Sequence, residues 1–408
     1  MAPPVRRRSA AALALTAAAV LLGLAGAARP DGDGPSAAST TGLTSTSIGP
    51  GTPGPPGTTA PTPRSFTLVA GGDVLLHPRL WEQAEADAAA AGTPGRDFRP
   101  LLAGVEPLVG GADLAVCHLE TPVAVAGEAP AGYPSFSVPP EIVPALADTG
   151  FDACTTASNH TYDRGAAGVD RTLAALDAAG IAHAGSARTP GEAAMTTQLP
   201  VEGADVALLS YTFGFNGVPA PAGESWRANS IDEARIRADA AAARAGGAEV
   251  VVVALHWGDE YDPAPTTGQR TLGPALVRSP DVDLVLGHHT HVVQPVERVD
   301  GEWVVYGMGN FVAHHATPGP PNEEGLLVRF TFTEGPDGWR VTDAQYAPLL
   351  VTRGDPVRLV DVGATAGPGA GAGAPPRARL QEAWDRTTTV VGSLGATGDG
   401  LRPIGHRP

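Results

Sequence analysis

Short apolar runs that end at polar residues recur along this chain, and segments with helix-like composition separate them. Such runs are typical of buried strands. The most β-branched run is Val250–Leu255, and the amphipathic segment Ile231–Ala245 lies just before it. Further on, Leu326–Thr333 and Trp339–Tyr346 flank a glycine-containing turn and are expected to form a hairpin. Strands that alternate with helices through most of residues 66–286 predict an α/β fold.

The N-terminal segment has the pattern of a secretory signal peptide, expected at residues 1–27. Arg6–Arg8 form a positive region, Ala11–Leu24 is an apolar run, and Ala25–Ala27 fits a small-residue cleavage site. Because the apolar run is short for a transmembrane helix, we expect cleavage near Ala27 and a secreted or cell-surface location. An uncleaved N-terminal anchor is the alternative. After this segment, no run is long enough to span a membrane.

Residues 28–64 are rich in Pro, Gly, Ser and Thr and contain almost no large apolar side chains. Such a segment cannot bury enough surface to offset the entropy lost on ordering, so we expect a disordered tether. The folded domain is expected at residues 65–352. For residues 353–408, which include the Gly/Ala/Pro-rich stretch Gly363–Pro376, we expect a low-complexity tail with a short terminal helix at Arg377–Thr388.

The charge of the chain limits the choice of partners. It has 43 Asp and Glu residues against 27 basic residues, and every basic residue is arginine. No basic stripe is present, which argues against nucleic acid as a partner. An anionic ligand would therefore have to bind at a local cation or at a metal ion.

Two cysteines, Cys117 and Cys154, each lie in an apolar run. Export would permit a disulfide between them if their strands are neighbours. Two buried free thiols are the alternative, since free cysteine behaves as a small hydrophobic residue.

Side chains suited to metal binding stand where the predicted strands end. The richest stretch is Val282–Pro295, in which an apolar run ends at Gly287 and three histidines follow. Imidazole is the commonest metal-binding side chain, although a single histidine or aspartate at a turn is more often structural. Here five strand ends carry such residues, namely Asp73, Glu120, Asn159, His160, His256, His289 and His291. Because ligands of α/β folds bind beyond the carboxyl ends of strands, we expect these side chains to converge.

Six motifs follow one another at predicted strand ends: GGDVLLH (Gly71–His77), HLETPV (His118–Val123), SNHTYDRG (Ser158–Gly165), HWGDEY (His256–Tyr261), GHHTHVVQP (Gly287–Pro295) and YGMGNF (Tyr306–Phe311). Together they resemble the CapA family of capsule-synthesis proteins, which is linked to poly-γ-glutamate and related to the calcineurin-like metallophosphoesterases. The resemblance covers about residues 66–311. It implies a metallophosphoesterase-like four-layer α/β/β/α sandwich with two packed mixed sheets.

The resemblance also implies a metal shell made of Asp73, Glu120, Asn159, His256, His289 and His291. In that pattern Asp73 binds the first metal, Glu120 takes the bridging position and Asn159 binds the second metal. Leu75 stands where the superfamily has a histidine, and the bridging residue is glutamate instead of aspartate, so the site would hold one or two divalent ions. The mixed oxygen and nitrogen set suits Mn, Fe or Zn better than Ca.

The catalytic candidates are His160, Asp163 and Glu260. The resemblance implies that His160 lies beside the substrate, off the metal, as a general acid or as a stabiliser of charge. Among the three neighbouring histidines, His289 and His291 match the superfamily's His-x-His pattern. His288 is therefore expected to point elsewhere and to tolerate replacement.

These expectations lead to two functions of different class. The first is a secreted or surface-tethered metal-dependent hydrolase or transferase in capsule or poly-γ-glutamate synthesis, attachment or trimming, acting on an amide or a phosphoester. The second is a non-catalytic module that binds or anchors the polymer. The expected partner is an anionic cell-surface polymer such as poly-γ-glutamate, or a phosphoester substrate, and envelope-biosynthesis proteins are further candidates.

Overall fold

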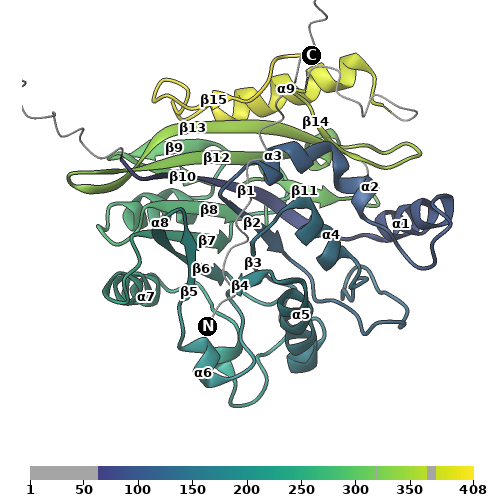
Figure 1. The fold of residues 1–408 in the computed structure, drawn as a ribbon, viewed down its shortest axis with the longest axis horizontal. Helices are drawn as coiled ribbons and strands as arrows, with labels where there is room; N and C mark the ends of the chain where they lie inside the picture. The colour runs from purple at the N-terminus through teal and green to yellow at the C-terminus, as the bar shows by residue number, and fades with distance from the viewer. Residues whose placement is uncertain (1–62, 318, 365–373) are drawn as a thin grey trace, which may run out of the picture. The chain divides into compact units, whose positions relative to one another are not determined.

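Two β-sheets pack face to face in the computed structural model, which describes residues 63–317, 319–364 and 374–408 (Figure 1). Within these residues the first sheet contains β1 (Ser65–Leu75), β2 (Leu114–Leu119), β3 (Ala153–Thr155), β4 (Ala182–Ala184), β11 (Asn310–Ala313), β12 (Glu324–Gly335), β13 (Gly338–Val351), β14 (Leu359–Asp361) and β15 (Arg402–Pro403). The second sheet contains β5 (Thr197–Val201), β6 (Ala204–Thr212), β7 (Val250–His256), β8 (Leu284–His288), β9 (Val296–Val299) and β10 (Glu302–Val305).

Both sheets are mixed. The strand order of the first is β14-β13-β12-β1-β2-β3-β4, with β11 also beside β1 and β15 beside β13. Strand β1 runs parallel to β2 and β11 and antiparallel to β12. The order of the second sheet is β5-β6-β7-β8-β10-β9, in which the inner strands are parallel and the edge strands β5 and β9 are antiparallel.

Helices cover the outer face of each sheet (Figure 1). The first sheet is covered by α1 (Pro78–Ala90), α2 (Arg99–Leu102), α3 (Glu106–Gly110), α4 (Ile142–Thr149) and α5 (Gly165–Ala179). The second sheet is covered by α7 (Glu233–Ala245) and α8 (Thr267–Val277), and α6 (Pro190–Ala193) is a short turn between β4 and β5. The predicted four-layer α/β/β/α sandwich is therefore confirmed.

The sheets are buried on both faces, and alternate residues of one strand serve two different cores. In β7, Val250 and Val252 lie in the core between the two sheets. The alternate residues Val251 and Val253 lie in the core under α7 and α8. A parallel strand that is buried on both faces needs apolar residues throughout, which explains the unbroken β-branched run in the sequence.

The chain enters the first sheet at Arg64. Its guanidinium lies 2.7 Å from a carboxylate oxygen of Glu249 and 2.7 Å from one of Glu334, and it stacks over the ring of Trp339. Arg64, the last residue of the expected tether, is thus part of the fold. Residues 1–27 and 28–62, for which we expect a signal peptide and a tether, lie outside the described residues.

The expected boundary of the domain at residue 352 needs correction. Beyond it, β14 and β15 join β13, and α9 (Arg377–Val391) packs against the same strand (Figure 1). Trp384 of α9 is buried beside Leu350 and Val362. The Gly/Ala/Pro-rich composition before α9 gives no indication of this contact. The surface that α9 covers is formed by β13 and the segment after β14, so the sequence of α9 alone does not predict it.

We expect Trp384→Ala to lower the free energy of unfolding by about 3 to 5 kcal/mol, as is typical when a buried tryptophan is truncated. Urea unfolding of the purified protein measures this change. Glu382→Ala is the control, because Glu382 is exposed on the same helix, and its effect should stay within about 0.5 kcal/mol. If α9 were a loose tail, both variants would unfold like the parent protein.

The two cysteines form a disulfide. Cys117 on β2 and Cys154 on β3 are paired in register across the two parallel strands, and both are buried. The bond therefore joins the two strands whose following loops carry Glu120 and Asn159. Among the helices of the described residues, none combines the length and the apolar character needed to cross a bilayer.

Candidate metal centre

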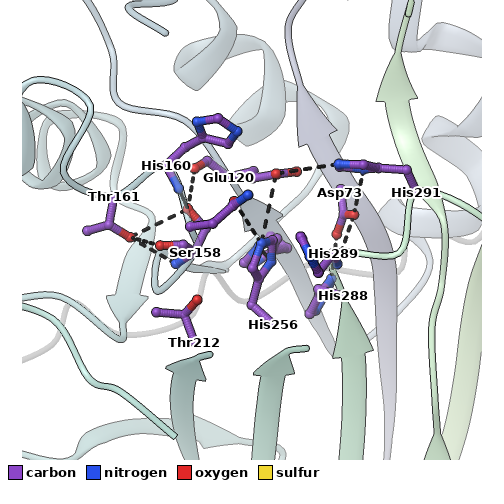
Figure 2. A network of polar contacts seen from close by, with 12 residues as sticks. Asp73, Glu120, Ser158, His160, Thr161, Thr212, His256, His288, His289 and His291 are labelled. Carbon is purple, nitrogen blue, oxygen red and sulfur yellow. Dashed lines mark hydrogen bonds and ion pairs between the residues drawn. The ribbon is translucent and has the colours of Figure 1, made fainter. Parts of the chain in front are cut away.

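The candidate side chains meet where the carboxyl ends of β1, β2, β7 and β8 lie at one edge of the two sheets (Figure 2). The first sheet supplies Asp73 from β1 and Glu120 directly after β2. The second sheet supplies His256 and His288, which are paired in register at the ends of β7 and β8. Parallel pairing explains this convergence, since the ends of neighbouring parallel strands share one edge.

Asp73 lies at the centre of the cluster and is fully buried. Gly72 before it allows a close approach of the Gly309 carbonyl, whose oxygen would lie 2.0 Å from a Cβ at position 72. One oxygen of Asp73 lies 3.0 Å from His288 Nδ1, and the other lies 3.2 Å from His291 Nδ1. Burial alone would raise the pKa of Asp73, but the hydrogen bonds to the two histidines outweigh it and hold the pKa well below its usual value.

Glu120 is buried with neither carboxylate oxygen in a hydrogen bond. Its Oε1 lies 3.8 Å from His291 Nε2 and 3.9 Å from His256 Nε2. Burial raises the pKa of Glu120 well above its usual value. A buried carboxylate without partners is costly, and a cation among these side chains would remove the cost. The residues therefore fit a bound metal ion.

A chain of hydrogen bonds links the histidines at the ends of β2 and β7. Thr155 Oγ1 lies 2.8 Å from His118 Nδ1, and His118 Nε2 lies 3.0 Å from His256 Nδ1. The chain ends at Asn159, whose Oδ1 lies 2.9 Å from His256 Nε2. Burial lowers the pKa of both imidazoles well below the usual value, which favours the neutral form that metal ligands need.

The loop after β8 carries two histidines in an unusual backbone conformation. His289 has φ +90° and His291 has φ +55°, both in the left-handed region that residues with side chains rarely adopt. Such strain persists where the surrounding structure fixes it, often at functional sites. Burial lowers the pKa of His289 to about 4. Burial also acts to lower the pKa of His291, but the Glu120 carboxylate and the hydrogen bond to Asp73 raise it to about 9.

His288 does not point away from the cluster, contrary to the expectation from the His-x-His pattern. Its side chain is 3% exposed, and its Nδ1 contacts Asp73 (Figure 2). The last residue of β8 therefore faces the site together with His289 and His291, because the left-handed backbone after it turns the following side chains back toward Asp73. Replacement of His288 would leave one oxygen of a buried carboxylate without its partner.

In the described residues, three groups of three side chains could each hold a metal ion, because their ligand atoms lie within 4.8 Å of one another. The groups are Asp73, His118 and His288; Asp73, Glu120 and His291; and Glu260, His289 and His291. The first two groups are buried, and the third reaches the surface because Glu260 is exposed. All three combine carboxylate oxygen with imidazole nitrogen, a set that suits Mn, Fe or Zn.

The catalytic candidates lie at the edge of the cluster. His160 Nδ1 is 2.8 Å from Asp163 Oδ2, which also accepts a hydrogen bond from the Phe136 amide. The edge of the His160 ring meets the ring of Phe136. Ser158 joins this loop to the centre, since its hydroxyl donates to the Glu120 carbonyl and accepts from the His160 amide. Asp163 thus fixes the orientation and the tautomer of His160.

The structure brings together all six predicted metal ligands, and it adds residues that were not predicted. His118 contacts His256, and Asn310 of β11 lies 3.0 Å from His291 Nδ1 through its Oδ1. His118 stands two residues before Glu120, so the strand period of two could have placed both on the same face. Asn310 lies in the YGMGNF motif, but that motif did not identify it as a site residue, and β11 is brought beside Asp73 by its pairing with β1.

The family model described as "Bacterial capsule synthesis protein PGA_cap" matches residues 67–315. The capsule biosynthesis protein CapA of Bacillus anthracis is 28% identical over 219 residues, which are 53% of this chain and 52% of that protein. The PGA biosynthesis protein CapA of Bacillus subtilis is 33% identical over 183 residues, which are 42% of this chain and 45% of that protein. The chain thus spans about half the length of these relatives.

Among solved structures, the calcineurin-like phosphoesterase YfkN from Bacillus subtilis is similar with a TM-score of 0.43 and 13% identity, over 80% of this chain and 98% of that chain. The family match covers more than half of the chain and runs from before Asp73 to beyond Asn310, so that it includes the whole candidate centre. This chain belongs to the bacterial capsule synthesis protein PGA_cap family.

Proposed function

We propose that this chain is a CapA-like accessory protein of capsule or poly-γ-glutamate synthesis, and that it acts on an envelope polymer through a divalent metal ion. Family membership and the names of its CapA relatives support the first part. The observation that carries the second part is the unpartnered, buried carboxylate of Glu120 with histidines on two sides. The signal-peptide pattern of residues 1–27 supports a location outside the cytoplasm.

The chemistry that we propose is metal-dependent hydrolysis or transfer at an amide or phosphoester bond. A divalent ion bound here would polarise a carbonyl or phosphoryl oxygen and lower the pKa of a bound water. Asp73 and Glu120 would provide the negative charge that holds a cation, and His118, His256 and His289 would provide neutral nitrogen ligands. His291, whose pKa is raised to about 9, would release its proton when the metal binds. His160, whose Nδ1 is taken by Asp163, would use Nε2 to transfer a proton to the leaving group.

Metal binding should appear as a gain in thermal stability that depends on Glu120. In the parent protein, an excess of Mn²⁺ or Zn²⁺ of about 100 times the dissociation constant should stabilise the fold by about 2.7 kcal/mol for each site. Glu120→Gln should lose most of this gain. Without metal, the variant should be at least as stable as the parent, because it no longer buries an unpaired carboxylate. Thermal unfolding with chelator and with added metal measures both effects.

The reaction itself is tested with poly-γ-glutamate and a phosphoester as substrates. The secreted full-length protein loaded with metal should shorten the polymer or release phosphate, as followed by size-exclusion chromatography and a phosphate assay. Metal-dependent binding of the polymer without cleavage would make the protein a non-catalytic anchoring module. A protein that gains no stability from any divalent ion would contradict the proposed centre.

A further inference from the structure

Two loops meet at the exposed end of the centre. One is the segment 257–261 after β7, and the other is the histidine loop after β8. Glu260 is exposed, whereas His289 and His291 are 5% and 3% exposed, and the three offer ligand atoms within 4.8 Å of one another. A carboxylate at the surface thus faces two buried imidazoles.

The loop that carries Glu260 is held against the histidine loop. The Trp257 amide donates to the His288 carbonyl at 3.2 Å, and the Trp257 ring nitrogen donates to the Tyr306 carbonyl at 2.9 Å. The Tyr261 amide donates to the carbonyl of Thr290 at 2.8 Å. Since Thr290 lies between His289 and His291, these bonds fix the position of Glu260 relative to both histidines.

His289 provides a second, independent indication of a ligand. Its Nδ1 is buried and has no hydrogen-bond partner, and its backbone is held at φ +90°. The ring of Phe213 lies 4.5 Å from its ring and covers one side of it. An unpartnered buried nitrogen on a strained residue costs free energy, which a metal ion bound to that nitrogen would recover.

We propose that Glu260, His289 and His291 form an outer metal site and that Glu260 is its closing ligand. The site takes a divalent ion that accepts mixed oxygen and nitrogen ligands, such as Mn²⁺ or Zn²⁺. The buried group of Asp73, His118 and His288 shares no residue with it, so these two groups can each hold an ion. The group of Asp73, Glu120 and His291 shares His291 with the outer site. Glu260 thereby acts as a metal ligand instead of a general acid or base.

The exposure of Glu260 gives the outer ion a different character from the buried one. Three protein ligands leave some coordination positions of the ion open. Because Glu260 is exposed, these open positions would face solvent. The outer ion should therefore exchange faster, and the carboxylate of an anionic polymer could bind to it directly. This last point rests on the proposed function, whereas the metal site itself does not.

The test uses the purified protein, stripped with a chelator and titrated with Mn²⁺ or Zn²⁺ in a calorimeter. The parent protein should bind two ions, and Glu260→Gln should weaken one of them by about tenfold or more while the other is unchanged. Asp259→Asn is the matched control, since Asp259 is the exposed neighbour and lies in none of the three groups. It should bind both ions like the parent. His289→Ala should weaken the same ion as Glu260→Gln.

Thermal unfolding of each variant in chelator shows that the fold is intact before the titrations are compared. Two ions with parent-like affinities in Glu260→Gln would overturn the outer site. A single ion that is insensitive to Glu260→Gln would also overturn it but would leave the buried centre standing. A parent protein that binds no ion would refute both centres.

Discussion

Replacing Asp73 by asparagine should abolish tight metal binding. Asp73 accepts hydrogen bonds from His288 and from the His289 amide and lies 3.2 Å from His291 Nδ1. An asparagine keeps one acceptor oxygen and presents an NH₂ group that can only donate. The metal affinity should fall by more than the roughly 10- to 100-fold that follows loss of an outer-shell partner. Metal analysis after dialysis and calorimetric titration measure the change.

The control for this variant is Asp283→Asn. Asp283 is a buried carboxylate too, but it lies before β8, where it accepts a hydrogen bond from the Val251 amide and pairs with Arg244. Its replacement should lower stability and leave the metal affinity unchanged. If Asp73→Asn bound metal like the parent protein, Asp73 would not be a ligand and the buried centre would be wrong.

Replacing His160 by alanine should keep the metal and lower the rate of cleavage by about 10²- to 10⁴-fold, the usual contribution of a general acid or base. The reason is that His160 contacts Asp163 and Phe136, and it belongs to none of the three potential metal groups. Metal content and turnover are measured on the same preparation.

Asp163→Asn provides the matched comparison for His160. This variant retains the His160 imidazole but removes the Asp163 carboxylate, whose Oδ2 lies 2.8 Å from His160 Nδ1. The loss of rate should therefore be smaller than in His160→Ala. A loss of metal in His160→Ala would instead assign this histidine to the metal shell.

The parts of the fold that could be predicted are those in which the local pattern carries the information. β7 is an apolar run because both of its faces are buried, and β12 and β13 enclose a glycine-containing turn. β11 and α9 could not be placed in this way. The four residues of β11 are fixed by pairing with β1, and α9 is fixed by the surface of β13. In both cases the partner is distant in sequence.

The candidate centre, too, could be predicted only in part from the local sequence pattern. Strand ends identified which segments would converge, since parallel strands present their carboxyl ends at one edge. The orientation of single side chains could not be predicted, because it depends on the left-handed backbone at His289 and His291. The His-x-His pattern concerns only His289 and His291, and it does not reveal the contact of His288 with Asp73, a residue far away in the sequence.

β1 also gives the domain a direction. The strand leaves Arg64 at the edge that holds Glu249 and Glu334 and reaches Asp73 eight residues after Ser65, about 26 Å further along the sheet. The end of the domain at which Arg64 enters the fold and the end that carries Asp73 are therefore separated by most of the length of this strand.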